Sequence, residues 1–145
     1  MTKYWIGVAC RDHVMRGVAG GFAQLGHGKR SGLARMQVGD WIAYYSPRTA
    51  LEASKPVQAF TAIGTVTGEI TQVSLEGGFC PYRRDVRFES DALEAPIKPL
   101  IPSLSFIKDP ARWGYPFRAG QLEISAEDLA VIRAAMNPRL ERLKV

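Results

Sequence analysis

A glycine-rich segment near the N-terminus limits most strongly what this chain can fold into. Residues 13–29, HVMRGVAGGFAQLGHGK, hold five of the fourteen glycines and both histidines. Glycine allows positive φ angles and close approach of the backbone to a ligand, at an entropic cost on folding. The strand-like runs YWIGVAC and DWIAYYSP flank the segment. A glycine-rich loop between strands that carries His, Phe, Gln and Lys is typical of the lip of a binding pocket.

The rest of the composition is that of an ordinary globular protein. A chain of 145 residues predicts one domain, residues 1–145, around one core. No apolar run approaches the roughly 18 residues of a membrane span, and the N-terminus lacks a signal-peptide layout, so we expect a cytoplasmic protein without a membrane partner. Cys10 and Cys80 have no CxxC spacing and are predicted to be reduced and buried.

Positive charge is concentrated in the first part of the chain. Residues 1–56 carry eight Lys or Arg and three acids, whereas residues 57–145 carry eleven of each sign. The whole net charge of +5 therefore lies in the part that holds the glycine-rich segment. Such a distribution favours an anionic partner, such as nucleic acid or a nucleotide, although a basic surface that only confers solubility would look the same.

The pattern along the chain predicts a mixed α+β fold. A helical turn is expected with Asp12 as its N-cap, running through Arg16 and ended by Gly17. A C-terminal helix is expected with Ser125 as its N-cap and Pro138 at its end, and its apolar face is predicted to hold Leu129, Ile132 and Met136. Pro47 is expected to stop a strand. Strands are predicted at residues 3–10, 41–46, 79–89 and 117–124, and residues 57–73 are predicted to form either one long strand bent or bulged at a glycine or two strands. In the run 79–89, Val86 and Phe88 alternate with charged residues. Shorter helical turns are predicted at 31–36 and 106–113. About five or six mostly antiparallel strands with short helices indicate a small open barrel.

Two phosphate-binding motifs can be excluded. The GHGKRS run resembles the end of a Walker A motif, but position 23 is Ala where that motif needs Gly, and Arg30 stands where it needs Ser or Thr. A dinucleotide GxGxxG fails because its third glycine would fall on Ser31. Two Cys and two His at these spacings do not predict a zinc site, and the scattered acids do not predict a two-metal centre. We therefore expect no metal and no cofactor.

A nucleophile–base pair remains as an alternative. Cys10 stands at a strand end before a helical turn, and His13 or His27 could lower the pKa of its thiol. No cysteine-hydrolase signature surrounds it. This alternative is an enzyme that acts on a nucleotide or a small anionic ligand through His13, His27 or Cys10. A protein-interaction module without a ligand is a third alternative.

Aromatic residues next to the loops favour a recognition site. A pocket for a planar base needs stacking faces and a few hydrogen-bonding groups for the base edge. Phe22, preceded by two glycines, is predicted to stack, whereas Trp5, Trp41 and Tyr44 are expected in the core. Residues that could read the base edge are Gln24, His27, Ser46 and Arg118.

Seven segments together resemble a known family. In chain order they are YWIGV, GVAGGFAQLGHGK, MQVGDWIAYYSP, VQAFTAIGTV, PYRRDVRF, LSFIKDPARWGYPFRAG and ISAEDLAVI. The combination, which spans nearly the whole chain, is similar to the EVE domain family, a branch of the PUA-like superfamily related to YTH and ASCH domains. The resemblance implies a PUA-like pseudo-barrel and a non-catalytic module that binds a modified base, either a modified cytosine in DNA or a modified RNA base. It also implies restriction or RNA-modification proteins as partners.

The resemblance, taken with the order of the segments, implies a site. Phe22 falls where YTH-like relatives place an aromatic cage residue, and Trp113 is expected to face it across the pocket. Phosphates would be held by Lys29, Arg30 and Arg11. The pocket residues implied are Cys10, Arg11, His13, Gly21, Phe22, Gln24, His27, Tyr45, Ser46, Pro47, Trp113, Phe117 and Arg118.

Overall fold

The computed structural model describes residues 1–138, which form a mixed α+β fold on a seven-stranded sheet. The strand order is β2-β5-β4-β3-β1-β7, and β6 pairs with β4. Within the described part, β1 and β3 run parallel and the other pairings are antiparallel, which confirms the predicted class. The single-domain prediction for residues 1–145 includes residues 139–145, which lie outside the described residues.

The strands follow the predicted order along the chain and differ from it mainly at their ends. The long run predicted at 57–73 is one curved strand, with a register shift between Val66 and Ile70. The bounds are β1 Tyr4–Val8, β2 Phe22–Ala23, β3 Trp41–Arg48, β4 Pro56–Gln72, β5 Tyr82–Phe88, β6 Ala95–Pro96 and β7 Gln121–Ile124. The helices are α1 Arg11–Gly20, α2 Ser31–Ala34 and α3 Ala126–Met136. Short 3-10 turns are η1 Gly26–Gly28, η2 Glu76–Gly78, η3 Lys98–Ser103, η4 Pro110–Arg112 and η5 Tyr115–Ala119.

Helix α1 is longer than the sequence predicts. The expectation that Gly17 ends the helix is wrong, because Gly17 is buried and a Cβ there would lie 2.6 Å from the carbonyl oxygen of Phe22. This glycine serves close packing of the helix on β2. The helix ends instead at Gly21, whose φ of 73° is left-handed and whose N–H donates to the Gly17 carbonyl. Its N-cap is Cys10 and not Asp12.

Two other strand predictions also fail at their ends. Pro47 does not stop β3, because it lies at a register shift between Ser46 and Arg48, where the sheet tolerates a residue without an N–H. The last strand begins at Gln121, since the preceding residues form η5. The C-terminal helix is confirmed, and the Ser125 hydroxyl accepts the Asp128 N–H at 3.1 Å as its N-cap.

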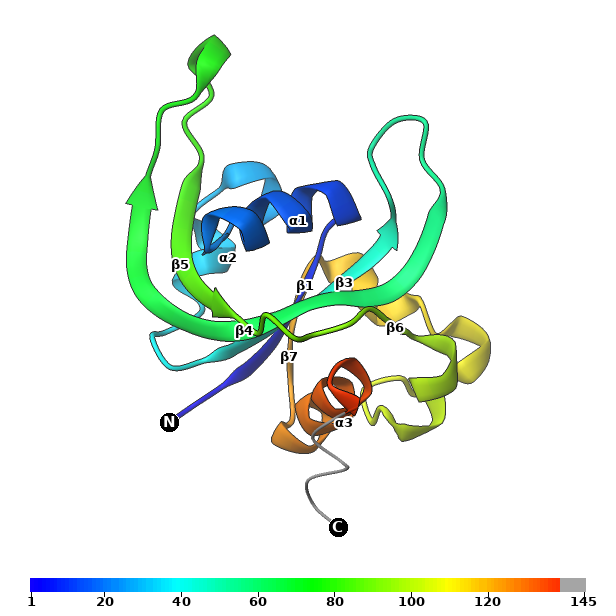
Figure 1. Ribbon diagram of the computed structural model, residues 1–145. Helices are drawn as coiled ribbons and strands as arrows, with labels where there is room; N and C mark the ends of the chain where they lie inside the picture. Colours follow the sequence, from blue (N-terminus) through cyan, green and yellow to red (C-terminus); the bar gives the residue numbers. More distant parts are fainter. Residues whose placement is uncertain (139–145) are drawn as a thin grey trace.

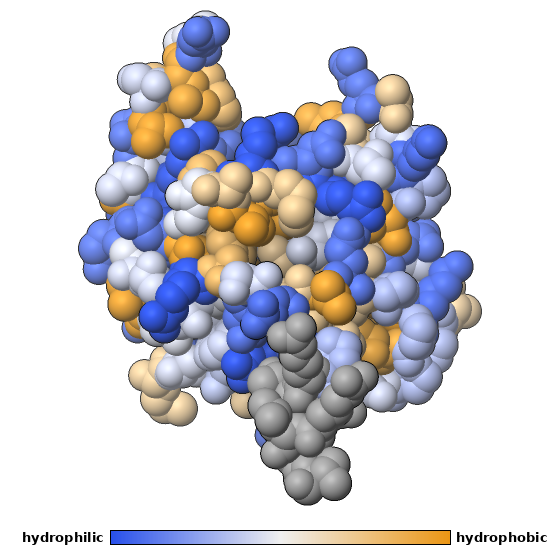
Figure 2. Space-filling model, viewed as in Figure 1, coloured by the Kyte–Doolittle hydropathy of each residue, from blue (hydrophilic) through white to orange (hydrophobic). Residues whose placement is uncertain are grey.

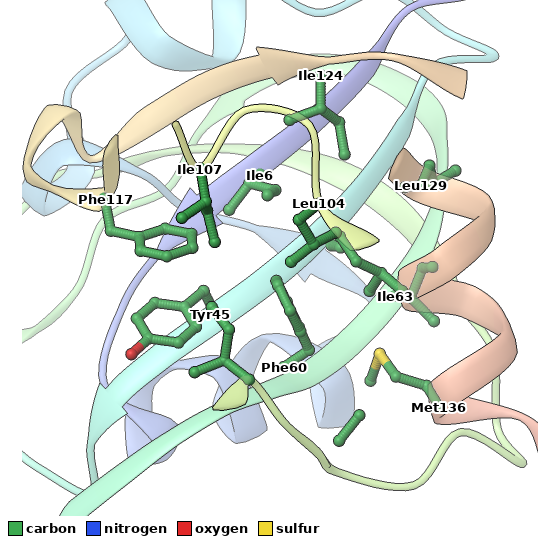
Figure 3. Packing of buried hydrophobic residues seen from close by; sticks show 14 residues of the cluster. Ile6, Tyr45, Phe60, Ile63, Leu104, Ile107, Phe117, Ile124, Leu129 and Met136 are labelled. Carbon is green, nitrogen blue, oxygen red and sulfur yellow. The ribbon is translucent and has the colours of Figure 1, made fainter. Parts of the chain in front are cut away.

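The sheet separates two hydrophobic clusters. Helix α1 packs across β2, β3 and β4, over a cluster centred on Trp5, Leu33, Ile42 and Tyr44. Helix α3 covers the other cluster, which holds Tyr45, Phe60, Phe117 and the predicted helix face Leu129, Ile132 and Met136 (Figure 3). Each fully buried Leu or Ile contributes about 1.5–3 kcal/mol relative to exposure. Alternation along β3 sends Tyr44 and Tyr45 to opposite clusters.

Two connections rise from the same side of the sheet, with α1 between them (Figure 1). The first, residues 49–55, joins β3 to β4 and is called the β3–β4 arm below. The second, residues 73–81 with η2 at its end, joins β4 to β5 and is called the β4–β5 arm. Between the arms, the face over α1 shows an apolar area (Figure 2).

Two further predictions concern membrane spans and cysteines. No helix within residues 1–138 is both long enough and apolar enough to cross a bilayer. Both cysteines are free, as predicted. The expectation that both are buried is wrong, because Cys80 lies exposed on the β4–β5 arm and Cys10 is half-buried.

Candidate functional site

Phe22, Gln24 and Arg83 form a compact cluster at the foot of the β4–β5 arm. The guanidinium carbon of Arg83 lies 3.9 Å from the centroid of the half-buried Phe22 ring. The Nε of the same guanidinium donates to Oε1 of Gln24 at 3.0 Å. A planar cation with hydrogen-bond donors on its edge is thus stacked on an aromatic ring and held at that edge by an amide. We call Phe22, Gln24, Arg83 and His13 the Phe22 site.

The backbone of Gln24 connects this cluster to α1 and the sheet. Its carbonyl oxygen accepts from His13 Nε2 at 2.9 Å and from the Tyr44 hydroxyl at 3.4 Å. Because the carbonyl can only accept, the contact requires a proton on Nε2 of His13, which leaves Nδ1 of a neutral ring as an acceptor. Burial raises the pKa of Tyr44 above its usual range, so its hydroxyl stays protonated and donates.

Glycines allow the Phe22 ring to lie where it does. A Cβ on Gly20 would lie 2.5 Å from Cε2 of Phe22, and the left-handed Gly21 turns the chain from α1 into β2. β2 then pairs antiparallel with β5, with Phe22 opposite Asp85. The glycine-rich segment therefore does shape the surroundings of the predicted stacking residue. Gly28, in the same segment, instead allows close packing against the β4–β5 arm. A Cβ on Gly28 would lie 3.0 Å from the Phe79 ring and 2.7 Å from Pro81.

Phe22 and Trp113 do not face each other, contrary to the prediction. Phe22 lies in β2 at one edge of the sheet, and β5 and β4 separate β2 from β3. Trp113 packs against Tyr45 of β3 in an edge-on contact, with ring centroids 6.4 Å apart, on the cluster that α3 covers. The prediction failed because the order of segments along the chain does not show which face of the sheet each loop reaches.

Three predicted pocket residues are core residues instead. Tyr45 and Phe117 stack on each other with centroids 4.1 Å apart, and both are buried. Burial raises the pKa of Tyr45 to about 12. Ser46 is fully buried, with its hydroxyl 2.7 Å from that of Thr61. None of the three side chains is placed to meet a ligand at the Phe22 site.

The other predicted residues do not gather at the Phe22 site. Arg11 begins α1 and pairs with Glu94, so it is not a free phosphate ligand. Cys10 and Pro47 are half-buried near that end of α1, whereas Arg118 is exposed and lies over Tyr115. His27, in η1, is exposed with a positive φ of 59°. Lys29 and Arg30 follow it on the surface. Among residues 1–138, Cys10 makes no hydrogen bond with either histidine.

The sequence comparison decides the family. A family model described as the EVE domain matches residues 3–135. This chain belongs to the EVE domain family. A UPF0310 protein of Mycolicibacterium gilvum is 53% identical over 91% of this chain and 94% of its own length. The UPF0310 protein YdcG of Bacillus subtilis is 43% identical over 93% of this chain and 92% of its own length.

Solved structures similar to this EVE domain show the same fold. The Mmi1 YTH domain matches with a TM-score of 0.57 and 8% identity, over 97% of this chain and 78% of that structure. Rpa0253 from Rhodopseudomonas palustris matches with a TM-score of 0.58 and 16% identity, over 93% of each chain. The predicted resemblance to the EVE family, and the relation of its fold to YTH domains, are confirmed.

In the described part of the EVE domain, two cavities lie away from the Phe22 site. One, of about 950 Å³, includes Trp41, Glu89 and Arg133 in its lining and reaches Pro138. There, Arg133 donates to both carboxylate oxygens of Glu89 at 2.8 and 2.9 Å. The other cavity, of about 470 Å³, is lined in part by Arg30. Within residues 1–138, no group of three or more His, Cys, Asp or Glu is placed to bind a metal.

Sequence reasoning missed Arg83, which completes the Phe22 site of the EVE domain. Its partner Gln24 is 59 positions away in the chain, so the contact depends on the pairing of β2 with β5. No local pattern predicts that pairing, because β2 has only two residues. The alternating RRDVRF run of β5 was the available signal, since every second side chain of a strand shares a face.

Proposed function

We propose that this protein is a non-catalytic nucleic-acid-binding module that holds one base, and specifically a modified one, against the ring of Phe22. The observation that carries the proposal is the arrangement of Arg83 between Phe22 and Gln24. A guanidinium and a nucleobase are both planar, and both offer hydrogen-bonding groups in the plane of the ring. A ring and an amide that hold the first are therefore suited to the second.

In this proposal the base replaces the guanidinium on the Phe22 ring. Phe22 supplies the stacking face, and Gln24 offers its amide to the base edge. Gln24 Nε2 has no hydrogen-bond partner among residues 1–138, so both a donor and an acceptor are available once Arg83 moves. Stacking on one aromatic ring contributes about 1–3 kcal/mol per base. The displaced Arg83 remains close enough to pair with a flanking phosphate.

The surface next to the Phe22 site suits a strand with exposed bases. Met15 and Val18 on α1 are 39% and 37% exposed, and Phe79 on the β4–β5 arm is 46% exposed. The apolar area over α1 in Figure 2 lies between the two arms. A single strand laid along α1 would place neighbouring bases on these apolar side chains. Lys29, exposed beyond η1, would meet its phosphates, which makes affinity fall with added salt.

The membership in the EVE family and the fold shared with the Mmi1 YTH domain support a nucleic-acid partner. The name of the latter protein does not state a ligand, so the choice of a base as the ligand rests on the arrangement of Phe22, Gln24 and Arg83. A modified cytosine in DNA and a modified RNA base both remain within the proposal. The restriction or RNA-modification partners implied by the resemblance belong to the same proposal.

A panel of short oligonucleotides tests this function. Single-stranded DNA with 5-methylcytosine or 5-hydroxymethylcytosine, RNA with a methylated base, and unmodified versions of each are scored by fluorescence anisotropy. We expect at least one modified strand to bind about tenfold or more tightly than its unmodified version, with affinity that declines as salt rises. Equal affinity for every pair of strands contradicts recognition of a modification.

A turnover assay distinguishes the enzyme alternative from a non-catalytic binding module. No catalytic pair involving Cys10 is assembled within the described residues, and His13 Nε2 is engaged by the Gln24 carbonyl. We expect no change in nucleotides or modified nucleosides incubated with the protein. Conversion that is abolished in His27→Ala would instead establish the enzyme.

A further inference from the structure

Arg84, next to Arg83 on β5, carries its charge into the protein interior. Its side chain is 6% exposed. The Nε donates to the carbonyl of Gly68 at 2.8 Å, and Nη1 donates to the carbonyls of Leu33 and Met36 at 3.0 and 2.8 Å. These neutral acceptors fix the orientation of the guanidinium but do not cancel its charge.

The single carboxylate that contacts Arg84 within the described residues is poorly placed to neutralise it. Nη2 lies 3.4 Å from Oε2 of Glu69, whose side chain is 85% exposed. A contact of that length to a solvated carboxylate is weak. Because a guanidinium has five N–H groups and four are used here, one N–H of Nη2 has no acceptor among residues 1–138.

Arg84 and Glu69, the carboxylate that its Nη2 contacts, both line a cavity of about 470 Å³. Arg30 and Gln37 lie at its wall and are exposed, so their side chains are free to turn into it. We call it the Arg84 cavity. Its full lining is Arg30, Ala34, Met36, Gln37, Val38, Glu69, Ile70 and Arg84.

We propose that the Arg84 cavity is an anion site that binds a phosphate group. Arg84 is a preorganised donor, Arg30 supplies a second positive charge, and Gln37 supplies a neutral donor. A phosphate oxygen would take the place now held by the Glu69 carboxylate, which would swing into solvent. Guanidinium groups suit phosphate because their N–H groups can bind two oxygens at once.

This site is distinct from the Phe22 site. Successive residues of a strand point to opposite faces, so Arg83 and Arg84 serve opposite faces of β5. The proposal deepens the proposed function by adding a phosphate subsite. It rests on that function only in naming nucleic acid as the molecule that carries the phosphate. A free phosphomonoester would offer the same chemistry.

Inorganic phosphate titrated into the full chain at constant ionic strength tests the site. The amide NMR signals of Gln37, Val38 and Ile70 report binding. We expect saturable shifts whose Kd falls about three- to fivefold in Glu69→Gln, which removes the competing carboxylate, and rises by a similar factor in Arg30→Ala. Arg35→Ala, an exposed arginine outside the cavity lining, is the matched control. Both test substitutions are at exposed positions.

Non-saturating shifts, or the same Kd in all four proteins, would mean an adventitious ion only and overturn the proposal. If a single-stranded oligonucleotide displaces phosphate, the source is the nucleic-acid backbone. If it does not, the site takes a free phosphomonoester. Phosphate binding must persist in Phe22→Ala, so a failure at the Phe22 site leaves this test unchanged.

Discussion

The Arg83 guanidinium lies over the Phe22 ring, with its central carbon 3.9 Å from the ring centroid. The contact joins β5 to β2 across the sheet edge and holds a cation on the surface that we propose for a base. It also explains why Phe22 is only half-buried: one face is closed by a long side chain that can move, and not by the core.

Arg83→Met tests the role of this cation. Methionine retains an apolar cover for Phe22 but cannot pair with a phosphate. We expect weaker binding of single-stranded oligonucleotides and a plot of log affinity against log salt whose slope is shallower by about one. Arg87→Met is the matched control, because Arg87 is an exposed arginine on the same strand, β5. Equal slopes in both variants would show that Arg83 does not contact a phosphate.

Gly17→Ala tests the packing that seats β2 against α1. In an open helix the change would stabilise by up to about 1 kcal/mol. Here the new Cβ would lie 2.6 Å from the Phe22 carbonyl oxygen, and overpacking of this kind costs about 1–3 kcal/mol. We expect net destabilisation of about 1–2 kcal/mol in urea unfolding. Gly114→Ala, with no atom within 4 Å of its Cβ, should stay within about 0.5 kcal/mol of the parent protein.

Ser46→Ala tests whether this residue is structural. The change leaves the Thr61 hydroxyl buried without its partner, which costs about 1–3 kcal/mol. Replacing both, Ser46→Ala with Thr61→Val, should recover most of that loss, because no orphaned polar group remains. Oligonucleotide affinity should not change in either variant. A loss of oligonucleotide affinity with unchanged stability would show that Ser46 is a binding residue, as the resemblance implies.

Alkaline unfolding tests the burial of Tyr45. Its pKa is raised to about 12 in the folded protein, against about 10 in the unfolded chain. The folded state therefore retains a proton that the unfolded state loses above pH 10. Its stabilising contribution is complete below pH 10 and is lost as pH rises towards 12. Urea unfolding at several pH values between 9 and 11 should show a shallower decline for Tyr45→Phe than for the parent protein.

The individual helices and strands could be predicted from the sequence better than the contacts between them. The alternation in β5, the Ser125 cap and the apolar face of α3 are local patterns, and the structure confirms each. Gly17 was misjudged because its role depends on β2, which packs against it from outside the helix. The same holds for Phe22 and Trp113: both lie in aromatic, glycine-flanked segments, but Trp113 packs on the cluster that α3 covers, whereas Phe22 lies in the edge strand β2. The pairing of β2 with β5, which brings Arg83 to Phe22, has no local signal at all.

The central claim is that a base stacks on Phe22, and the most direct test is the affinity of Phe22→Ala for the modified strand that binds best and for its unmodified version. Tyr115→Ala, which removes an exposed aromatic ring elsewhere, is the matched control. We predict a loss of about 1–3 kcal/mol on the modified strand, a smaller loss on the unmodified one, and no change in the control. An equal loss on both strands, or none on either, would contradict the account.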